Sequence, residues 1–151
     1  MKTPSIKTTY SEKAVPAMKK DLKIENPMAM PRIAKVVVNV GIGKILKDQK
    51  RVDEVVASLE AITGQKVLLT KARKAIAGFK IREDLENGAR TTLHGKRMWD
   101  FLDRLFLIAL PRVRDFQGVT ETSVDHAGNL NLGLKDHTIF SEIVPEKVQH
   151  I

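Results

Sequence analysis

The apolar residues of this chain recur at two spacings, one typical of strands and one typical of helices. Residues 33–40 are rich in valine and alternate, so that one side is wholly apolar while the other includes Lys35 and Asn39. A helical stripe follows, formed by Val52, Val55, Val56, Leu59 and Ile62. The stripe stops at Gly64, a residue suited to the left-handed conformation that ends many helices. These segments predict a strand with one mixed face, then a helix.

Two further helices are predicted from the same spacing. Residues 11–22 have an apolar stripe, with Ser11 as a plausible N-cap and Pro16 in or near the first turn. Residues 96–110 present a broad apolar surface suited to a helix lying across a sheet, and Pro111 is expected to end it. The helix at residues 96–110 is not expected to bind a ligand, because its apolar face is needed for packing.

Several short segments are expected to complete a sheet. Strands are predicted at residues 66–70, 78–83 and 89–94, with a basic loop at 71–77 and a tight turn at Asn87 and Gly88. A further strand is predicted where Leu130, Leu132 and Leu134 alternate with polar residues, after a turn at 125–129. The expected fold is α+β: a mostly antiparallel sheet with helices packed on one face and the other face open for RNA. Residues 1–151 are expected to form one domain.

Composition narrows the class of partner. The chain carries 26 Lys and Arg against 18 Asp and Glu, a net charge of +8, which favours a polyanionic partner. It contains no cysteine, so disulfides and thiol nucleophiles are excluded, as are cysteine-zinc sites. No apolar run is long enough to span a bilayer. A cytoplasmic location is therefore expected.

Positive charge is concentrated in residues 65–82, which contain no acidic residue. The cations of this run are Lys66, Lys71, Arg73, Lys74, Lys80 and Arg82. Most short charge runs are only solvated loops. This run is long, however, and its small residues Ala75, Ala77 and Gly78 permit close approach of the backbone to phosphates. RNA contact is therefore the favoured interpretation, and binding through six or more phosphates should weaken about a thousandfold between 50 and 200 mM salt.

The strand faces support that interpretation. One predicted strand face holds Lys35 and Asn39, another holds Lys80 and Arg82, and a third holds Arg90, Thr92 and His94. A solvated sheet would explain any one of these faces but explains all three together less well. Asn, Thr and His suit groove edges and 2′-hydroxyl groups, whereas Lys and Arg suit phosphates.

Patterns typical of enzymes are missing from the sequence. Gly41 and Gly43 begin a dinucleotide-binding pattern, but Leu46 stands where its third glycine would be. Asp100 and Asp103 are better explained as the solvated edge of a helix than as an acid-base pair. The four histidines lack metal-ligand spacing; they are His94, His126, His137 and His150. We therefore expect no catalytic residues, no metal and no cofactor.

One long string makes the chain similar to a known family. The string GQKVLLTKARKAIAGFKIRE, preceded by VNVGIG and followed by TTLHGKRMWDFLDRL and ALPRVRDFQG, resembles the bacterial type of ribosomal protein L5. The resemblance runs in order from about residue 31 to about residue 142. Members of that family belong to the large ribosomal subunit and bind 5S rRNA.

The resemblance implies specific sites and partners. It implies that the sheet holds 5S rRNA, with Asn39, Gln65 and Thr92 at the family's contact positions, and that the loop at residues 71–78 reaches the peptidyl-site tRNA, with Arg73 and Lys74 leading. It also implies contacts with 23S rRNA in the central protuberance and with neighbouring large-subunit proteins, and a bridge to a small-subunit head protein. With the residues of the charge run and strand faces, the expected rRNA-binding set is Lys35, Asn39, Gln65, Lys66, Arg90, Thr92 and His94. The expected tRNA-contacting set is Lys71, Arg73, Lys74, Gly78, Lys80 and Arg82.

The chain departs from the family at two places. His94 stands where arginine is common, which gives a weaker and pH-dependent phosphate contact. The chain also ends at Ile151, before the family's usual last strand and helix, so it is either a naturally short member or a truncated one. Two rival interpretations stay open: a free regulatory module that binds messenger RNA, and a nucleotide-dependent enzyme using residues 41–44 as a phosphate loop. A membrane-surface role is weaker, because the apolar helix faces are needed for the core.

Overall fold

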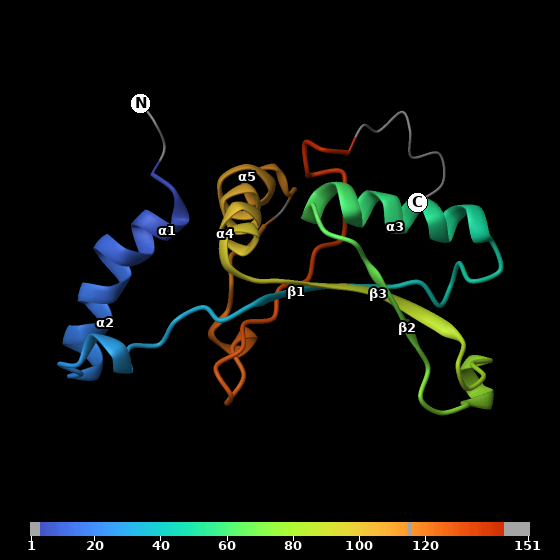
Figure 1. Cartoon of the computed structure of the whole chain (residues 1–151), viewed down its shortest axis with the longest axis horizontal. Coiled ribbons are helices and arrows are strands. Elements are labelled where there is room, and N and C mark those ends of the chain that lie inside the picture. Colours follow the sequence, from blue (N-terminus) through green and yellow to red (C-terminus); the bar gives the residue numbers. More distant parts are fainter. Residues whose placement is uncertain (1–3, 115, 144–151) are drawn as a thin grey trace.

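A three-stranded antiparallel sheet forms the centre of the molecule, in the strand order β1-β3-β2 (Figure 1). The computed structural model describes residues 4–114 and 116–143. Strand β1 spans Val36–Gly41, β2 spans Leu68–Lys71 and β3 spans Glu86–Leu93. β3 pairs with both neighbours, so Asn39 and Leu68 both lie opposite Arg90. The predicted α+β class with an antiparallel sheet is confirmed.

Helices cover one face of this sheet (Figure 1). Helix α3 spans Gln49–Thr63, and α4 spans Gly95–Arg104 before continuing through the π-helical segment Leu105–Ala109 into α5, Leu110–Arg112. Two buried apolar clusters lie between the helices and the sheet. The cluster at α3 comprises Ile42, Val52, Val55, Leu59, Val67 and Ala89. The cluster at α4 includes Leu93, Met98, Phe101, Leu102, Leu105 and Phe140. Partly buried Val38 of β1 packs against both clusters, so both are built on the same sheet.

The ends of α3 follow from local chemistry. The carboxylate of Asp48 accepts a hydrogen bond from the Arg51 N–H at 3.4 Å and so caps the first turn. Gly64 ends the helix in the left-handed conformation with φ 65°, as the sequence predicts. The apolar stripe of α3 is buried, so this helix is predicted correctly in position and orientation.

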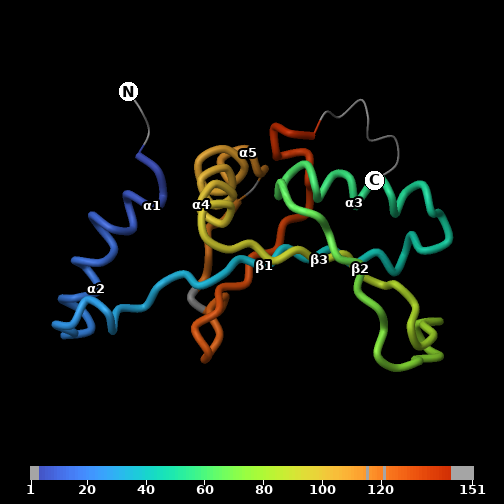
Figure 2. The backbone as a smooth tube through the Cα atoms, viewed as in Figure 1, coloured from blue at the N-terminus to red at the C-terminus, as the bar shows by residue number. Residues whose placement is uncertain are grey.

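An N-terminal arm leads to β1 from one end of the molecule (Figure 2). It is continuously helical through α1 (Ile6–Thr9), a π-helical segment (Tyr10–Ala14) and α2 (Val15–Leu22), and the short helix Pro27–Ala29 follows. The predicted start at Ser11 is wrong, because the hydroxyl of Ser5 accepts from the Thr8 N–H and caps the helix there. Pro16 is tolerated because it follows a π-helical turn.

Two sequence expectations about the second half of the sheet are wrong. Asn87 and Gly88 lie inside β3 rather than in a turn. A Cβ at Gly88 would lie 2.6 Å from Oγ1 of Thr70, so glycine there permits the close approach of two strands. Residues 78–83 do not form a strand; a 3-10 turn at Ala77–Phe79 and a single bridge between Ile76 and Ile81 occupy that region. The connection between β2 and β3 is therefore the whole of residues 72–85, which we call the β2–β3 loop.

The C-terminal part also differs from expectation. Pro111 does not end the preceding helix but lies at the start of α5. The turn at residues 125–129 is confirmed, since Asp125 Oδ1 accepts from the N–H groups of Ala127 and Asn129. The strand predicted around Leu132 is absent from the described residues, and only a bridge between Val124 and Leu130 is found there. The alternation misled because the leucines on either side of Leu132 are exposed rather than packed.

Candidate nucleic-acid interface

Figure 1 shows one face of the sheet turned away from the helices, which we call the open face. The strand register places polar side chains from neighbouring strands on it. Alternate residues of each strand contribute to it: Val37 and Asn39 from β1, Leu68 and Thr70 from β2, Arg90 and Thr92 from β3. Pairing sets Asn39 beside Arg90, and Val37 beside Thr92. Three of the residues predicted to bind rRNA thus lie within one small area.

The chemistry of the open face is mixed. Asn39 and Arg90 are exposed, and Thr92 is half-buried. Directly opposed side chains in an antiparallel pair stand about 5 Å apart, so the Asn39 amide and the Arg90 guanidinium are within reach of a single nucleotide. Val37 and Leu68 are 47% and 61% exposed and provide apolar ground between the polar groups. Such a surface can take both a charged backbone and a sugar or base.

Two more predicted residues lie at one end of the open face. Lys35 immediately precedes β1 and His94 immediately follows β3, and both side chains are exposed. The pairing of Val36 with Leu93 brings these two ends together. His94 Nδ1 lies 3.3 Å from the carbonyl oxygen of Ala34. The cation and the imidazole therefore extend the polar area beyond the strands themselves.

Gln65 and Lys66 connect α3 to β2 beside this face. Gln65 Nε2 donates a 2.9 Å hydrogen bond to the backbone carbonyl of Thr92, and the Gln65 side chain is half-buried. Its amide thus holds β3 to the end of α3, a structural role that the sequence does not reveal. Lys66 is exposed. The backbone of Thr92 is therefore held in place by Gln65, and both residues belong to the set predicted to bind rRNA.

The β2–β3 loop extends the hairpin and lies on the side of the sheet away from the helices (Figures 1 and 2). Backbone hydrogen bonds join Ala72 to Leu85 at its base, and Ile76 to Ile81 in both directions near its tip. The loop and adjoining strand end expose the predicted cations Lys71, Arg73, Lys74, Lys80 and Arg82. Lys80 and Arg82 therefore belong to the loop and not to a strand face, which corrects the sequence expectation.

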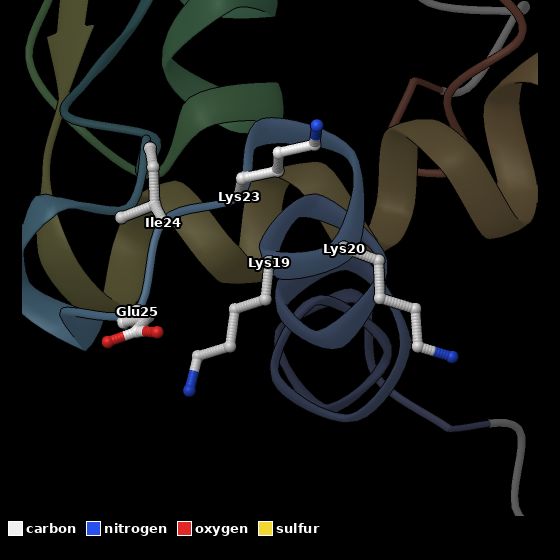
Figure 3. A pocket seen from close by; sticks show the side chains of 5 residues that line it. All are labelled: Lys19, Lys20, Lys23, Ile24 and Glu25. Carbon is white, nitrogen blue, oxygen red and sulfur yellow. The ribbon is translucent and has the colours of Figure 1, made fainter.

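Sequence reasoning missed two features. One is a basic end of α2, where Lys19, Lys20 and Lys23 surround a shallow hollow of about 450 Å³ together with Ile24 and Glu25 (Figure 3). The three ammonium groups point away from one another, so they do not converge on a small ligand. Their place at a helix C-terminus is electrostatically favourable. The other is Phe79 at the tip of the β2–β3 loop, which is 75% exposed. The sequence did contain a signal for Phe79, because it is an aromatic residue within the basic, acid-free run of residues 65–82.

The geometry argues against a phosphate loop at residues 41–44. The first helix after them begins at Gln49, and Asp48 caps it while also pairing with Arg51 at 3.2 Å. A carboxylate therefore stands where a phosphate would have to bind. Within residues 4–114 and 116–143, no group of three His, Asp or Glu side chains could hold a metal ion, and His150 lies outside these ranges. No described helix is both long and apolar enough to cross a bilayer.

Comparison with known proteins identifies the family to which this chain belongs. The family model for Ribosomal protein L5 matches residues 26–82, and the model for the C-terminus of the same ribosomal family matches residues 86–151. The chain belongs to the ribosomal protein L5 family. It is 46% identical over 149 residues to large ribosomal subunit protein uL5 of Kocuria rhizophila, which covers 99% of this chain and 79% of that protein. The uL5 of Rubrobacter xylanophilus is 48% identical over 146 residues, 97% of this chain and 81% of the relative.

Membership of the L5 family fixes the class of function. The chain is a structural constituent of the large ribosomal subunit and not an enzyme. Ribosomal RNA and other ribosomal proteins are its partners. Both rival interpretations, the free regulatory module and the nucleotide-dependent enzyme, are thereby superseded. The resemblance noted in the sequence is confirmed across both halves of the chain.

Proposed function

We propose that this L5-family chain holds 5S rRNA on the open face of its sheet and attaches that RNA to the central protuberance. The residues assigned to this contact are Lys35, Asn39, Gln65, Lys66, Arg90, Thr92 and His94. The observation that carries the assignment is the pairing of Asn39 with Arg90 on a face that the helices leave uncovered. Amide, hydroxyl and guanidinium groups there match the edges, 2′-hydroxyls and phosphates of RNA.

The β2–β3 loop has a separate role in this proposal. Lys71, Arg73, Lys74, Gly78, Lys80 and Arg82 contact the peptidyl-site tRNA. The loop is held as an extension of the hairpin by backbone hydrogen bonds, and its cations are exposed, so it presents a shaped positive surface. Contacts with 23S rRNA and a bridge to a small-subunit head protein complete the proposal, without assigned residues. Residues 1–151 act as one domain in this proposal, and the expectation about the family's last strand and helix lies outside the described residues.

The first experiment tests the open face. Asn39→Ala and Thr92→Ala should each weaken binding of purified 5S rRNA by about 1 to 3 kcal/mol, because each leaves an RNA group unpaired. Thr91→Val is the matched control, since Thr91 precedes Thr92 but points into the core, where it is 3% exposed. Filter-binding titrations at a fixed salt concentration measure the affinities. Equal affinity of all three variants and the unmodified chain would contradict the assigned face.

The second experiment separates the loop from the sheet. The double change Arg73→Ala with Lys74→Ala should leave 5S rRNA affinity nearly unchanged and speed dissociation of tRNA from the peptidyl site of ribosomes that carry the variant. Lys19→Ala with Lys20→Ala removes the same charge from the basic end of α2 and serves as control. A large loss of 5S rRNA binding in the loop variant alone would show that the loop belongs to the 5S contact instead.

A further inference from the structure

The tip of the β2–β3 loop presents an aromatic ring to solvent. Phe79 is 75% exposed, the most exposed aromatic side chain of the chain. A single exposed apolar residue is common in proteins and needs no special cause. The ring of Phe79 differs because of where it stands, at the end of a defined turn and in the middle of a run of cations.

The backbone beneath Phe79 is held in a specific shape. The N–H of Ile76 donates to the carbonyl of Ile81 at 2.9 Å, and the N–H of Ile81 donates back at 3.1 Å. Between them, Lys80 N–H donates to the Ala77 carbonyl at 3.0 Å, and Lys80 adopts φ 54°. A left-handed conformation is unfavourable for a residue with a side chain, so the turn is not a relaxed one. These bonds give Phe79 a fixed base.

The charges around this ring select the kind of partner. Arg73 and Lys74 lie on one limb of the loop, Lys80 and Arg82 on the other, and all four are exposed. No acidic residue occurs between Gln65 and Arg82, and the two carboxylates of the loop, Glu83 and Asp84, follow at its base next to β3 rather than at its tip. Four cations around a flat apolar ring complement a ligand that joins phosphates to an aromatic face, which is the chemistry of a nucleotide. In a duplex the base faces are covered by stacking, so the complementary RNA is one that offers an unpaired base.

We propose that Phe79 stacks on an unpaired base of the RNA that the β2–β3 loop contacts, while the surrounding cations hold the adjoining phosphates. This inference deepens the proposed contact with peptidyl-site tRNA and rests on the loop being an RNA-binding element. It assigns the two jobs to different side chains: the ring recognises an exposed base, and Arg73, Lys74, Lys80 and Arg82 provide affinity that depends on salt.

The test uses the full chain and two RNA probes of equal length and charge. One is a stem–loop with 2-aminopurine in its loop, and the other is a fully paired duplex. Phe79→Leu keeps an apolar side chain without a ring and should weaken stem–loop binding about five- to hundredfold while leaving duplex binding unchanged. Stacking of a ring on 2-aminopurine should quench its fluorescence. Phe79→Trp keeps an aromatic ring, so it should retain both the affinity for the stem–loop and this quenching. Since Phe79 is exposed, neither variant threatens folding.

Salt dependence separates the ring from the cations. The fold-loss of Phe79→Leu should be the same at 50 and 200 mM salt, because stacking releases no counterions. Arg73→Ala with Lys74→Ala should instead flatten the salt dependence on both probes. Equal binding of the stem–loop by Phe79→Leu and the unmodified chain would overturn stacking, and would indicate an apolar contact with protein at this tip.

A ribosome experiment keeps this inference apart from the tRNA assignment. If Phe79→Leu weakens stem–loop binding and also speeds tRNA dissociation from the peptidyl site, both stand. If it weakens stem–loop binding while neither it nor Arg73→Ala with Lys74→Ala changes tRNA dissociation, stacking stands and the tRNA assignment fails. If it changes neither while Arg73→Ala with Lys74→Ala speeds dissociation, the tRNA assignment stands and stacking fails.

Discussion

At the scale of single residues, two buried threonines differ in whether their hydroxyl groups are hydrogen-bonded. Thr63, 2% exposed, donates its hydroxyl proton to the Leu59 carbonyl at 2.7 Å near the end of α3. Thr91, 3% exposed, points from β3 toward the helices, and its Oγ1 has no hydrogen-bond partner among the described residues. A buried hydroxyl without a partner destabilises the fold, whereas a bonded one does not.

The first prediction compares these two residues. Thr91→Val should raise the free energy of unfolding by about 1 kcal/mol, because it replaces an unpaired hydroxyl with a methyl of similar shape. Thr63→Val should lower it by a similar amount, because the Leu59 carbonyl loses its side-chain donor. Urea denaturation of both variants measures the difference. Destabilisation by Thr91→Val would show that its hydroxyl is hydrated in solution.

The second prediction concerns Gly88 in β3. In Gly88→Ala, the new Cβ would lie 2.6 Å from Thr70 Oγ1, so we expect a loss of about 1 to 3 kcal/mol of stability from overpacking. Adding Thr70→Ala should restore most of that loss. Gly41→Ala is the matched control, because Gly41 pairs with Gly88 and a Cβ there meets nothing within 4 Å. Thermal unfolding measures all four proteins, and an unrestored double variant would contradict the assigned clash.

Residue patterns foretold much of the candidate interface and missed the rest for identifiable reasons. The alternation of β1 correctly placed Asn39 on the exposed face, because burial of one side fixes the other. Alternation failed at Lys80 and Arg82, since a hydrogen-bonded loop can carry the same sequence pattern as a strand. Gln65 was expected at the RNA, yet its bond to Thr92 joins segments far apart in the chain and has no local signal.

At the scale of elements, helix positions were easier to predict than helix ends. The stripe and the glycine cap of α3 agree because both are local properties. Pro111 was expected to stop a helix, but a π-helical segment before it leaves room for proline at the start of α5. The arm helix also begins earlier than expected. Its N-cap is Ser5, which precedes the apolar stripe from which the start of the helix was predicted.

The third prediction concerns the attachment of the C-terminal segment to α4. Arg104 Nη1 donates to Glu142 Oε1 at 2.5 Å, and buried Phe140 stacks near Phe101 with ring centroids 6.1 Å apart. Burial alone would raise the pKa of Glu142, but the hydrogen bond and charge of Arg104 outweigh it and lower that pKa below its ordinary value of about 4.5. A lowered folded-state pKa contributes stability above the ordinary value and loses it as pH falls through the folded value.

Glu142→Gln should therefore lower stability by about 1 kcal/mol near pH 6, and the difference should shrink as the pH falls through the lowered folded-state pKa, below which the carboxylate is protonated in both states. Urea denaturation across this range measures the effect. Glu25→Gln provides a matched control at an exposed carboxylate. A difference that stays constant with pH would show that packing rather than charge holds the segment to α4.

At the scale of the whole molecule, the arm is joined to the body by a few specific contacts. The Ile6 N–H donates to Asp103 Oδ1 at 2.6 Å, and the ring of Tyr10 lies 5.8 Å from that of Trp99 on α4. The Tyr10 hydroxyl donates to the carbonyl of Pro31 at 2.5 Å, which links the arm helix to the segment that enters β1. Tyr10 therefore connects three parts of the chain, and Asp103 has a structural partner rather than a catalytic one.

The fourth prediction uses this junction, because Trp99 is the chain's one tryptophan and half-buried. Tyr10→Ala should shift Trp99 emission to the red and speed amide exchange across residues 6–22, while exchange in β3 stays unchanged, since the arm opens locally. Tyr10→Phe keeps the ring and loses only the bond to Pro31, so it should cost about 0.5 to 1.5 kcal/mol with little change in emission. If emission and exchange are unchanged in Tyr10→Ala, the contacts of Ile6 with Asp103 suffice to hold the arm, and Tyr10 is not the residue on which its docking depends.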